Sequence, residues 1–267
     1  MKPIALTRSV SPSIVNCELT HLNREPINLA RAAEQHSLYE RALIALGCTI
    51  QRLPALPDLP DSVFVEDTAV VLPELAIIAR PGAASRRSEV TSVADALRPH
   101  HPLTFIESPG TLDGGDVLPI GSTIYVGEST RTNTDGIRQL AELTSGYGYV
   151  VRPVKLSGCL HLKSAVTRVA DDVVLLNSAW VDSSSFRGLH HIEVHPGEPF
   201  AANALWIGDN VIYPATCDET RQRLEQNGIN VLLIETDELQ KAEGAVTCCS
   251  ILIPTLSKRD SQSPAPA

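Results

Sequence analysis

The chain has 267 residues, of which 43% are hydrophobic and 20% charged; 22 Lys and Arg against 31 Asp and Glu give a formal net charge of −9. This composition is typical of a globular protein and excludes wholesale disorder, collagen and coiled coil. The negative balance argues against a nucleic-acid partner, because phosphates require a basic face.

The sequence carries no sign of a membrane or secreted protein. No apolar run approaches the roughly 20 residues that span a bilayer, so we expect no membrane partner. The N-terminal stretch already carries Arg8, where a signal peptide would still be apolar. The six cysteines include no Cys-x-x-Cys pair, which argues against a disulfide scaffold or the usual zinc spacing. We therefore expect a reduced, cytoplasmic protein.

The predicted elements repeat along the chain. A strand at 4–8 is followed by a helix at 29–46, with Gly47 as its C-cap, and by a strand at 49–53. Hairpins of two apolar strands around a short polar turn are predicted at 63–80, 114–128, 164–177 and 203–214. Helices are predicted at 90–97, 135–143 and 219–226, and strands after them at 104–106, 149–151 and 231–234.

Equivalent points of these units recur at a nearly fixed interval. Asp67, Asp116, Ser164 and Asn203 are about 39 to 49 residues apart, and one further step reaches Cys248. The fifth unit is shared between the chain ends, with a strand at 250–253 pairing with the one at 4–8. The sequence thus predicts an α/β fold, a five-bladed α/β propeller of hairpin–helix–strand units in one domain over residues 1–256. The polar, Pro-rich residues 257–267 are predicted to be a disordered tail.

Two adjacent cysteines precede the last predicted strand. Cys248 and Cys249 fit the pattern of small buried hydrophobes. Adjacent residues of a strand point to opposite faces, so at most one of the two thiols faces the centre. A nucleophilic thiol needs a base and a residue that orients that base. His161 is the leading partner, because it precedes its own hairpin at the same end of the repeat as Cys248.

Two other motifs have simpler interpretations. His190, His191 and His195 have the residue type of a metal site but no further ligand at helical spacing, so we interpret them as a solvated loop. The stretch TLDGGD at 111–116 lacks the Lys-Ser/Thr of a phosphate-binding loop. Its two acids, Asp113 and Asp116, suggest an orienting carboxylate and a carboxylate that stabilises a turn.

Charged residues gather at the repeat entrances. Asp61, Glu66 and Asp67 lie together in the sequence and fit either a hydrated loop or a pocket for a cation. Arg86 and Arg131 each follow the second strand of a hairpin. Loop arginines are usually solvated, but two at equivalent points can clamp a carboxylate with their forked donors.

Six motifs in order along nearly the whole chain carry a resemblance. FVEDTAVV, RPGAASRR, TLDGGDVLP, GESTRTN, LHLKS and GAVTCCSILI together resemble the dimethylarginine dimethylaminohydrolase family of the guanidino-modifying, or pentein, superfamily. The propeller inferred from the repeats agrees with the fold that this resemblance implies. It also implies a cysteine hydrolase that converts Nω-methylated arginine, or a close analogue, to citrulline and an alkylamine, with a small-molecule guanidino substrate and neither cofactor nor metal.

The resemblance implies a role for each candidate residue. Cys248 would be the nucleophile, His161 the general acid and base, and Asp113 the acid that orients the histidine. Asp67, helped by Glu66, would hold the guanidinium. The thiol would attack the guanidinium carbon to give a covalent thiouronium, and the histidine would protonate the amine and then activate water. The cationic substrate can itself lower the thiol pKa.

The ends of the substrate are likewise assigned by resemblance. Arg86 and Arg131 would grip the α-carboxylate, and Asp61 with the backbone carbonyls of Leu19 and Ala242 would receive the α-amino group. Two features depart from the relatives: Glu243 stands where mammalian members have Asp, and the stretch at 17–22, which would form a lid, differs from theirs.

Three alternatives remain open at this point. Arginine deimination would use free arginine, although dedicated deiminases carry a helical insertion for which this chain is too short. Transfer of the amidino group to another amine is a further variant. A non-catalytic pentein that acts as a binding module would need neither Cys248 nor His161, and citrulline release separates it from the enzymes.

Overall fold

The structure is a computed structural model that describes residues 2–254. The predicted domain end at residue 256 and the predicted tail at 257–267 lie outside the described residues. Among the helices that the structure describes, none has the length and apolar character needed to cross a membrane.

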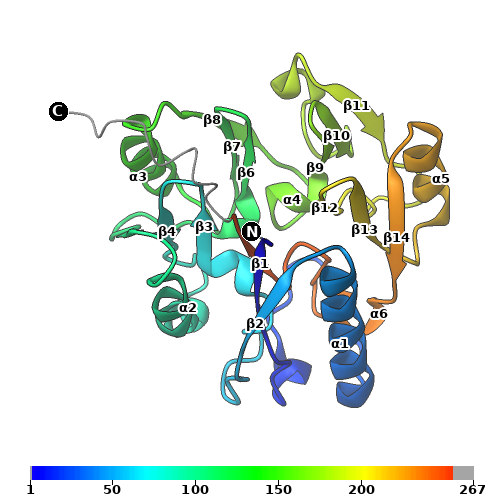
Figure 1. Cartoon of the computed structure of the whole chain (residues 1–267), viewed down its shortest axis with the longest axis horizontal. Coiled ribbons are helices and arrows are strands. Elements are labelled where there is room, and N and C mark those ends of the chain that lie inside the picture. The colour runs from blue at the N-terminus through cyan, green and yellow to red at the C-terminus, as the bar shows by residue number, and fades with distance from the viewer. Residues whose placement is uncertain (1, 255–267) are drawn as a thin grey trace.

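The strands of residues 2–254 form five small sheets. They are β1 (Ile4–Arg8), β2 (Thr49–Leu53), β3 (Ala69–Val71), β4 (Ala76–Ile78), β5 (Leu103–Phe105), β6 (Val117–Ile120), β7 (Thr123–Glu128), β8 (Val150–Lys155), β9 (Val166–Ala170), β10 (Val173–Leu176), β11 (His190–Glu193), β12 (Leu205–Ile207), β13 (Asn210–Pro214), β14 (Asn230–Ile234) and β15 (Ile251–Ile253). The sheet orders are β15-β1-β2, β3-β4-β5, β6-β7-β8, β9-β10-β11 and β12-β13-β14. In each sheet the middle strand pairs antiparallel with the inner strand and parallel with the outer one. Figure 1 shows the five sheets around a central axis, which is the predicted propeller.

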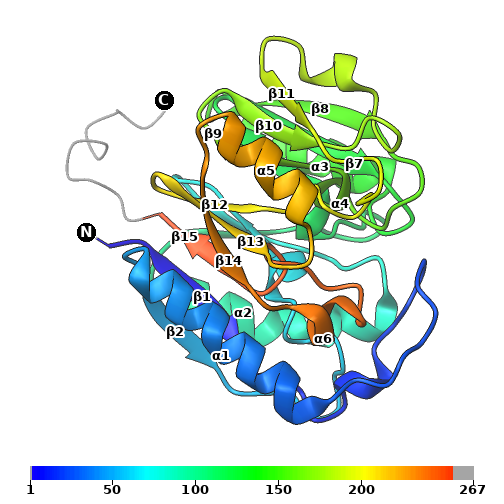
Figure 2. The same cartoon turned by 90° about the vertical axis from the view of Figure 1, so that its right-hand side faces the viewer.

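The two ends of the described chain close the ring. Strand β15 pairs antiparallel with β1, and the register places Ile4 opposite Ile253 and Leu6 opposite Ile251. The predicted pairing of 250–253 with 4–8 is therefore confirmed. Cys248 lies just before β15 and therefore belongs to the blade that contains β1. Figure 2 shows β15 beside β1.

Helices connect the middle strand to the outer strand in four of the five sheets of residues 2–254. The helices are α1 (Leu29–Ala45), α2 (Val90–Leu97), α3 (Thr134–Ser145), α4 (Leu162–Ala165), α5 (Asp218–Gln226) and α6 (Asp237–Gln240), of which α4 and α6 are single turns. The side chain of Asn28 accepts the Arg31 N–H at the start of α1, and the side chain of Asn133 caps α3 in the same way. Gly47 follows α1 with φ 95°, a conformation that suits glycine.

The fourth blade departs from the prediction. A short 3-10 helix at Ser183–Phe186 replaces the connecting helix. The predicted solvated loop around His190 is wrong at residues 190–193, because His190–Glu193 is strand β11, which pairs parallel with β10. Ile192 anchors this strand with 3% of its surface exposed. A single buried residue gives little sequence signal for a strand.

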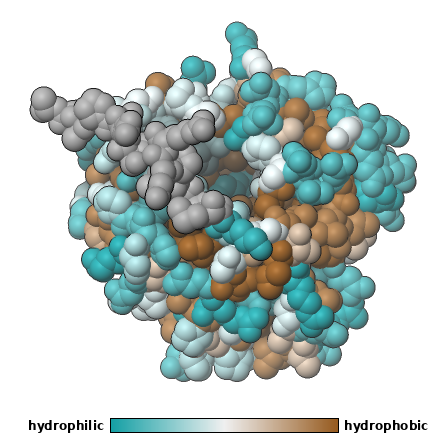
Figure 3. All heavy atoms as spheres, in the orientation of Figure 1, coloured by the Kyte–Doolittle hydropathy of each residue, from teal (hydrophilic) through white to brown (hydrophobic). Residues whose placement is uncertain are grey.

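Apolar residues of neighbouring blades pack against each other. Ile77 of β4, Val126 of β7 and Leu140 of α3, for example, are fully buried in one cluster. The inner strands β3, β6, β9, β12 and β15 surround a cavity of about 250 Å³. Figure 3 shows the face seen in Figure 1, which is hollowed near its centre. Figure 2 shows the N-terminus on one side of the molecule and α6 with the loop before α1 on the other.

Candidate active site

Four segments converge because each directly precedes an inner strand. The 3-10 helices η2 (Val65–Thr68) and η4 (Gly114–Asp116) lead into β3 and β6. Helix α4 leads into β9, and the turn at 246–249 leads into β15. Equivalent ends of inner strands meet at one end of a propeller axis. The repeat-related residues that are far apart in sequence are therefore brought together.

One pocket contains most of the predicted site residues. It is lined by Asp61, Asp67, Arg86, Arg131, His161, Ala242 and Cys248, together with Glu18, Phe64, Leu160 and Glu243. Leu19 is half-buried beside the apolar core and is not one of the lining residues. Its neighbour Glu18 lines the pocket. Sequence reasoning gave no role to Glu18 or Leu160, although Glu18 lies in the stretch at 17–22 and Leu160 begins the motif LHLKS.

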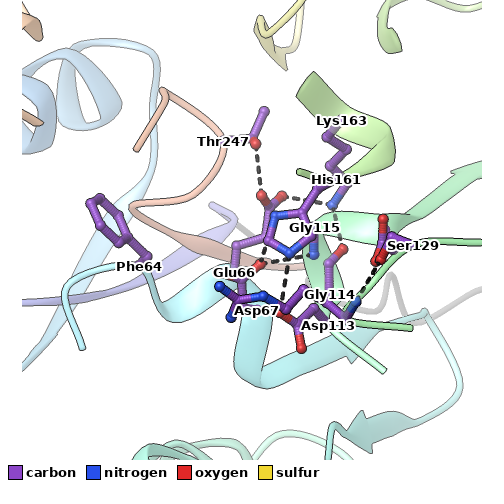
Figure 4. Close-up of polar contacts among 12 residues, drawn as sticks. Phe64, Glu66, Asp67, Asp113, Gly114, Gly115, Ser129, His161, Lys163 and Thr247 are labelled. Atoms are coloured by element: carbon purple, nitrogen blue, oxygen red, sulfur yellow. Dashed lines mark hydrogen bonds and ion pairs between the residues drawn. The ribbon is translucent and has the colours of Figure 1, made fainter. Parts of the chain in front are cut away.

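His161 lies between two carboxylates. Its Nε2 is 3.1 Å from Asp113 Oδ2, and its Nδ1 is 3.8 Å from Asp67 Oδ1 (Figure 4). Asp113 is fully buried, and its other oxygen accepts the Gly82 N–H at 2.9 Å, which fixes its orientation. A Cβ atom at Gly115 would lie 2.7 Å from Asp67 Oδ1 and 2.8 Å from His161 Nδ1, so the packing here requires glycine.

These carboxylates control the charge of the imidazole. Burial alone would lower the pKa of His161, but Asp67, the hydrogen bond with Asp113 and the charge of Asp116 together raise it to about 9. Asp116 also accepts the Leu162 N–H at 2.9 Å and so anchors the segment that follows the histidine. Burial raises the pKa of Asp116 to about 6. At neutral pH the imidazole is therefore protonated.

The two cysteines have different surroundings. Cys248 is half-buried and lines the pocket, whereas Cys249 has 2% exposure and packs in an apolar cluster. The predicted reason for this difference, strand alternation, is wrong, because residues 246–249 form a turn ahead of β15. Burial, followed by the charges of Glu66 and Asp67, raises the pKa of the Cys248 thiol well above its ordinary value. The resting thiol is therefore protonated.

Arg86 is engaged by the protein itself. Its Nη1 donates to Asp67 Oδ2 at 2.5 Å, and its Nη2 donates to Glu89 Oε2 at 2.9 Å. The same Nη2 reaches the carbonyls of Asp61 and Phe64 at 3.2 and 3.0 Å. The predicted open loop arginine is instead a buried residue with 5% exposure. Glu89 was missed by sequence analysis, although its spacing of three residues from Arg86 is a recognised signal for an ion pair.

Arg131 has weaker contacts. Its Nη2 is 3.5 Å from Thr20 Oγ1 and 3.6 Å from Glu18 Oε2. Asp61 lies in the same pocket, and its Oδ2 accepts the Glu18 N–H at 3.2 Å. The loop before α1 thus contacts both of these charged side chains.

Glu66 is not brought into the pocket. Its carboxylate contacts Lys163 Nζ at 2.6 Å and accepts the Thr247 hydroxyl at 2.6 Å (Figure 4). It lines the central cavity behind the site, as Lys163 and Thr247 also do. Its carboxylate is therefore engaged by Lys163 and Thr247, and its charge raises the pKa of the Cys248 thiol. Lys163 was missed by the sequence analysis.

One group of side chains has the spacing of a metal site. Ligand atoms of Asp67, Asp113 and His161 lie within 4.8 Å of one another. Their oxygens already accept hydrogen bonds from Arg86, Gly82 and Gly115. A protonated imidazole has no free lone pair for a metal. The group is best described as an ion-pair network.

The fold is a five-bladed α/β propeller, and its site combines a thiol, a buried imidazole–carboxylate pair and two arginines. These features define a pentein of the guanidino-modifying type. The arginine deiminase family matches residues 25–196. An N(G),N(G)-dimethylarginine dimethylaminohydrolase of Pseudomonas aeruginosa is 36% identical over 234 residues, 87% of this chain and 91% of its own. One of Streptomyces coelicolor is 40% identical over 248 residues, 92% and 95% of the two chains.

A solved structure of a protein with the same name is similar to this chain in fold. It is described as DDAH from Pseudomonas aeruginosa, a cysteine-to-serine mutant complexed with citrulline, and it matches with a TM-score of 0.90 at 34% identity. The match covers 95% of this chain and all of that one. The chain belongs to the dimethylarginine dimethylaminohydrolase family.

Proposed function

We propose that this protein is an amidine hydrolase that converts Nω-methylated arginine to citrulline and an alkylamine, with Cys248 as the nucleophile. The observation that carries the proposal is the common pocket of Cys248, His161 and Asp67, with Asp113 behind the imidazole. The relatives are named for this reaction, and one of their structures holds citrulline.

The first half of the reaction uses the resting protonation states. The substrate guanidinium binds beside Asp67, and its positive charge lowers the pKa of the Cys248 thiol toward that of an ordinary thiol. The thiol proton leaves to solvent. The Cys248 Sγ forms a bond to the guanidinium carbon, and the bond from this carbon to the alkylated nitrogen breaks. His161, protonated at neutral pH, donates its proton to the departing amine. A covalent thiouronium remains on Cys248.

The second half reverses the role of the histidine. Neutral His161 takes a proton from water, and the hydroxyl oxygen bonds to the thiouronium carbon. The C–S bond then breaks as the new hydroxyl group loses its proton to the departing sulfur, which forms the urea carbonyl of citrulline and regenerates the thiol. Asp113 holds the imidazole in place through both halves, because its carboxylate is itself fixed by the Gly82 N–H.

The charged residues around the pocket would bind the rest of the substrate. Arg131, whose Nη2 makes long contacts of 3.5 Å with Thr20 Oγ1 and 3.6 Å with Glu18 Oε2, takes the α-carboxylate. Arg86, which lines the same pocket while Asp67 and Glu89 hold it, adds its positive charge to this site. The α-amino group lies near Asp61 and the backbone carbonyls of Leu19 and Ala242.

Deimination of arginine itself is the second candidate, because the family that matches residues 25–196 is described as arginine deiminase. A panel of arginine, Nω-methylarginine and the dimethylated forms, assayed for citrulline and for the released amine, tests both candidates. We expect alkylamine release with citrulline from the methylated forms and none from a Cys248→Ser control. Citrulline from arginine alone would favour the deiminase, and no citrulline from any substrate would refute both.

The cysteines and the net charge bear on the cellular environment of the enzyme and on the kind of partner that it binds. All six cysteines are free, which supports a reducing, cytoplasmic environment. The net charge of −9 supports a small-molecule substrate over a nucleic-acid partner.

A further inference from the structure

Glu243 binds a row of backbone amides on the opposite end of the chain. Its Oε1 accepts the N–H groups of Thr20, His21 and Leu22 at 2.9, 2.6 and 2.7 Å. Its Oε2 also lies 3.1 Å from the Thr20 nitrogen. Successive N–H groups that converge on one point form a concave anion site of the kind called a nest. A side chain of this protein fills that site.

The backbone of Glu243 has an uncommon conformation. Its φ is +56°, in the left-handed region that residues with a Cβ rarely adopt. Such a conformation persists where surrounding contacts impose it. Glu243 follows Ala242 and precedes the turn that carries Cys248, so the amide row is tied directly to the nucleophile segment.

Hydrogen bonds of Glu243 fix two carbonyl groups, one through its side chain and the other through its backbone N–H. Leu19 C=O and Thr20 N–H belong to one trans peptide and point in opposite directions. The Thr20–Glu243 hydrogen bond therefore turns Leu19 C=O away from Glu243. Ala242 C=O and Glu243 N–H also share a peptide, and that N–H donates to Gln240 C=O at 3.0 Å.

These two carbonyls are the groups proposed above to receive the α-amino group of the substrate. Glu243 itself lines the pocket with Ala242 and Cys248. Without the carboxylate, the exposed residues 20–22 lose four hydrogen-bond contacts to the nucleophile segment. The Leu19 peptide is then free to rotate.

We propose that Glu243 is a positioning residue that latches residues 20–22 to the Cys248 segment and orients the carbonyls of Leu19 and Ala242. It thereby sets the preference for guanidino compounds that carry an α-amino group. The substrate part of this inference rests on the proposed function, whereas the latch itself does not.

Hydrogen exchange tests the latch without any substrate. The variant is Glu243→Asn, because Asn tolerates the left-handed backbone but is uncharged and one methylene shorter. Glu25→Gln is the matched control, an exposed acid on the same loop. We expect the amides of Thr20, His21 and Leu22 to exchange at least about 10-fold faster in Glu243→Asn and at the wild-type rate in the control. Equal exchange in all three proteins would overturn the latch. If Glu243→Asn fails to fold, the same comparison is made with Glu243→Gln, which keeps the side-chain length and loses the charge.

Steady-state kinetics test the preference. With Nω-methylarginine, Glu243→Asn should raise KM by about 10- to 100-fold, as for a lost charge-assisted contact, and change kcat by less than about 3-fold. With desamino-Nω-methylarginine, the analogue of this substrate that lacks the α-amino group, Glu243→Asn should leave KM unchanged. An equal rise for both substrates would overturn the assignment to the amino group. If the wild-type protein releases no citrulline, the proposed function fails, and the exchange experiment still decides the latch.

Discussion

The charge of Asp67 acts on both His161 and Cys248, and its removal should shift the pKa values of both in the same direction. Its Oδ1 is 3.8 Å from His161 Nδ1, and its charge helps to raise the pKa of the Cys248 thiol. We predict that Asp67→Asn lowers the pKa of His161 and that of Cys248 together. The positive charge of Arg86, which Asp67 no longer neutralises in this variant, disfavours the imidazolium and favours the thiolate, and so lowers both pKa values further.

The magnitude follows from the geometry. The rise in the pKa of His161 from 6.5 to about 9 corresponds to roughly 3 kcal/mol. A unit charge at 3.8 Å contributes about 4 kcal/mol at an effective dielectric constant of 20. The attraction of Asp67 alone is therefore larger than the net rise, because the charges of Asp67 and Asp113 must also offset the cost of burying the imidazolium. We expect the pKa of His161 to fall by about 3 units in the variant.

Two measurements check this prediction without substrate. An NMR titration of the His161 imidazole, assigned by comparison with His161→Gln, gives its pKa directly. The rate of alkylation of Cys248 by neutral iodoacetamide at fixed pH reports the thiolate, and it should be higher in Asp67→Asn. Asp58→Asn, which removes an exposed acid, is the control.

Three results would refute the reasoning. The first is a His161 that titrates near 6.5 in the wild-type protein, and the second is an identical midpoint in wild type and Asp67→Asn. The third is slower alkylation of the variant. Each would mean that Asp67 does not set the charge of the site.

Further predictions concern individual side chains. Cys248→Ser should abolish citrulline release while Cys249→Ser keeps most of it, and the reverse pattern would reassign the nucleophile. Arg131→Ala should raise KM by about 10- to 150-fold for methylarginine and leave a simple alkylguanidine unaffected; Arg86→Ala should also lower the unfolding free energy, by about 3–5 kcal/mol in chemical denaturation, because it strands two buried carboxylates. His161→Gly should still be alkylated at the thiol by a haloacetamidine, seen by mass spectrometry, yet release almost no citrulline. His161 has a folded pKa of about 9, above its unfolded value, so its contribution to stability is complete below about pH 6.5 and is lost as pH rises through 9. The stability gap between wild type and His161→Gln should accordingly shrink from pH 6 to pH 10, and a constant gap would contradict the shift.

The sequence by itself determined the repeating architecture. Turn residues and runs of apolar residues depend on neighbours along the chain, so hairpins and helices could be placed within a few residues of their bounds. The shared blade of 250–253 and 4–8 followed from counting repeats, and the register of β15 on β1 confirms it. Strand β11 was missed because its order comes from pairing with β10, which its own residues hardly indicate.

The tertiary structure decided which charges meet. Glu66 and Asp67 are adjacent in sequence, yet one faces Lys163 in the central cavity and the other faces His161 in the pocket. The partners of Glu66 lie 97 and 181 residues away, and no local pattern encodes a contact of that kind. The sequence suggested that Arg86 was a loop arginine free to clamp a carboxylate, because no local pattern reveals that it is buried against Asp67. Buried charges require partners, and packing of distant segments determines which partner each one finds.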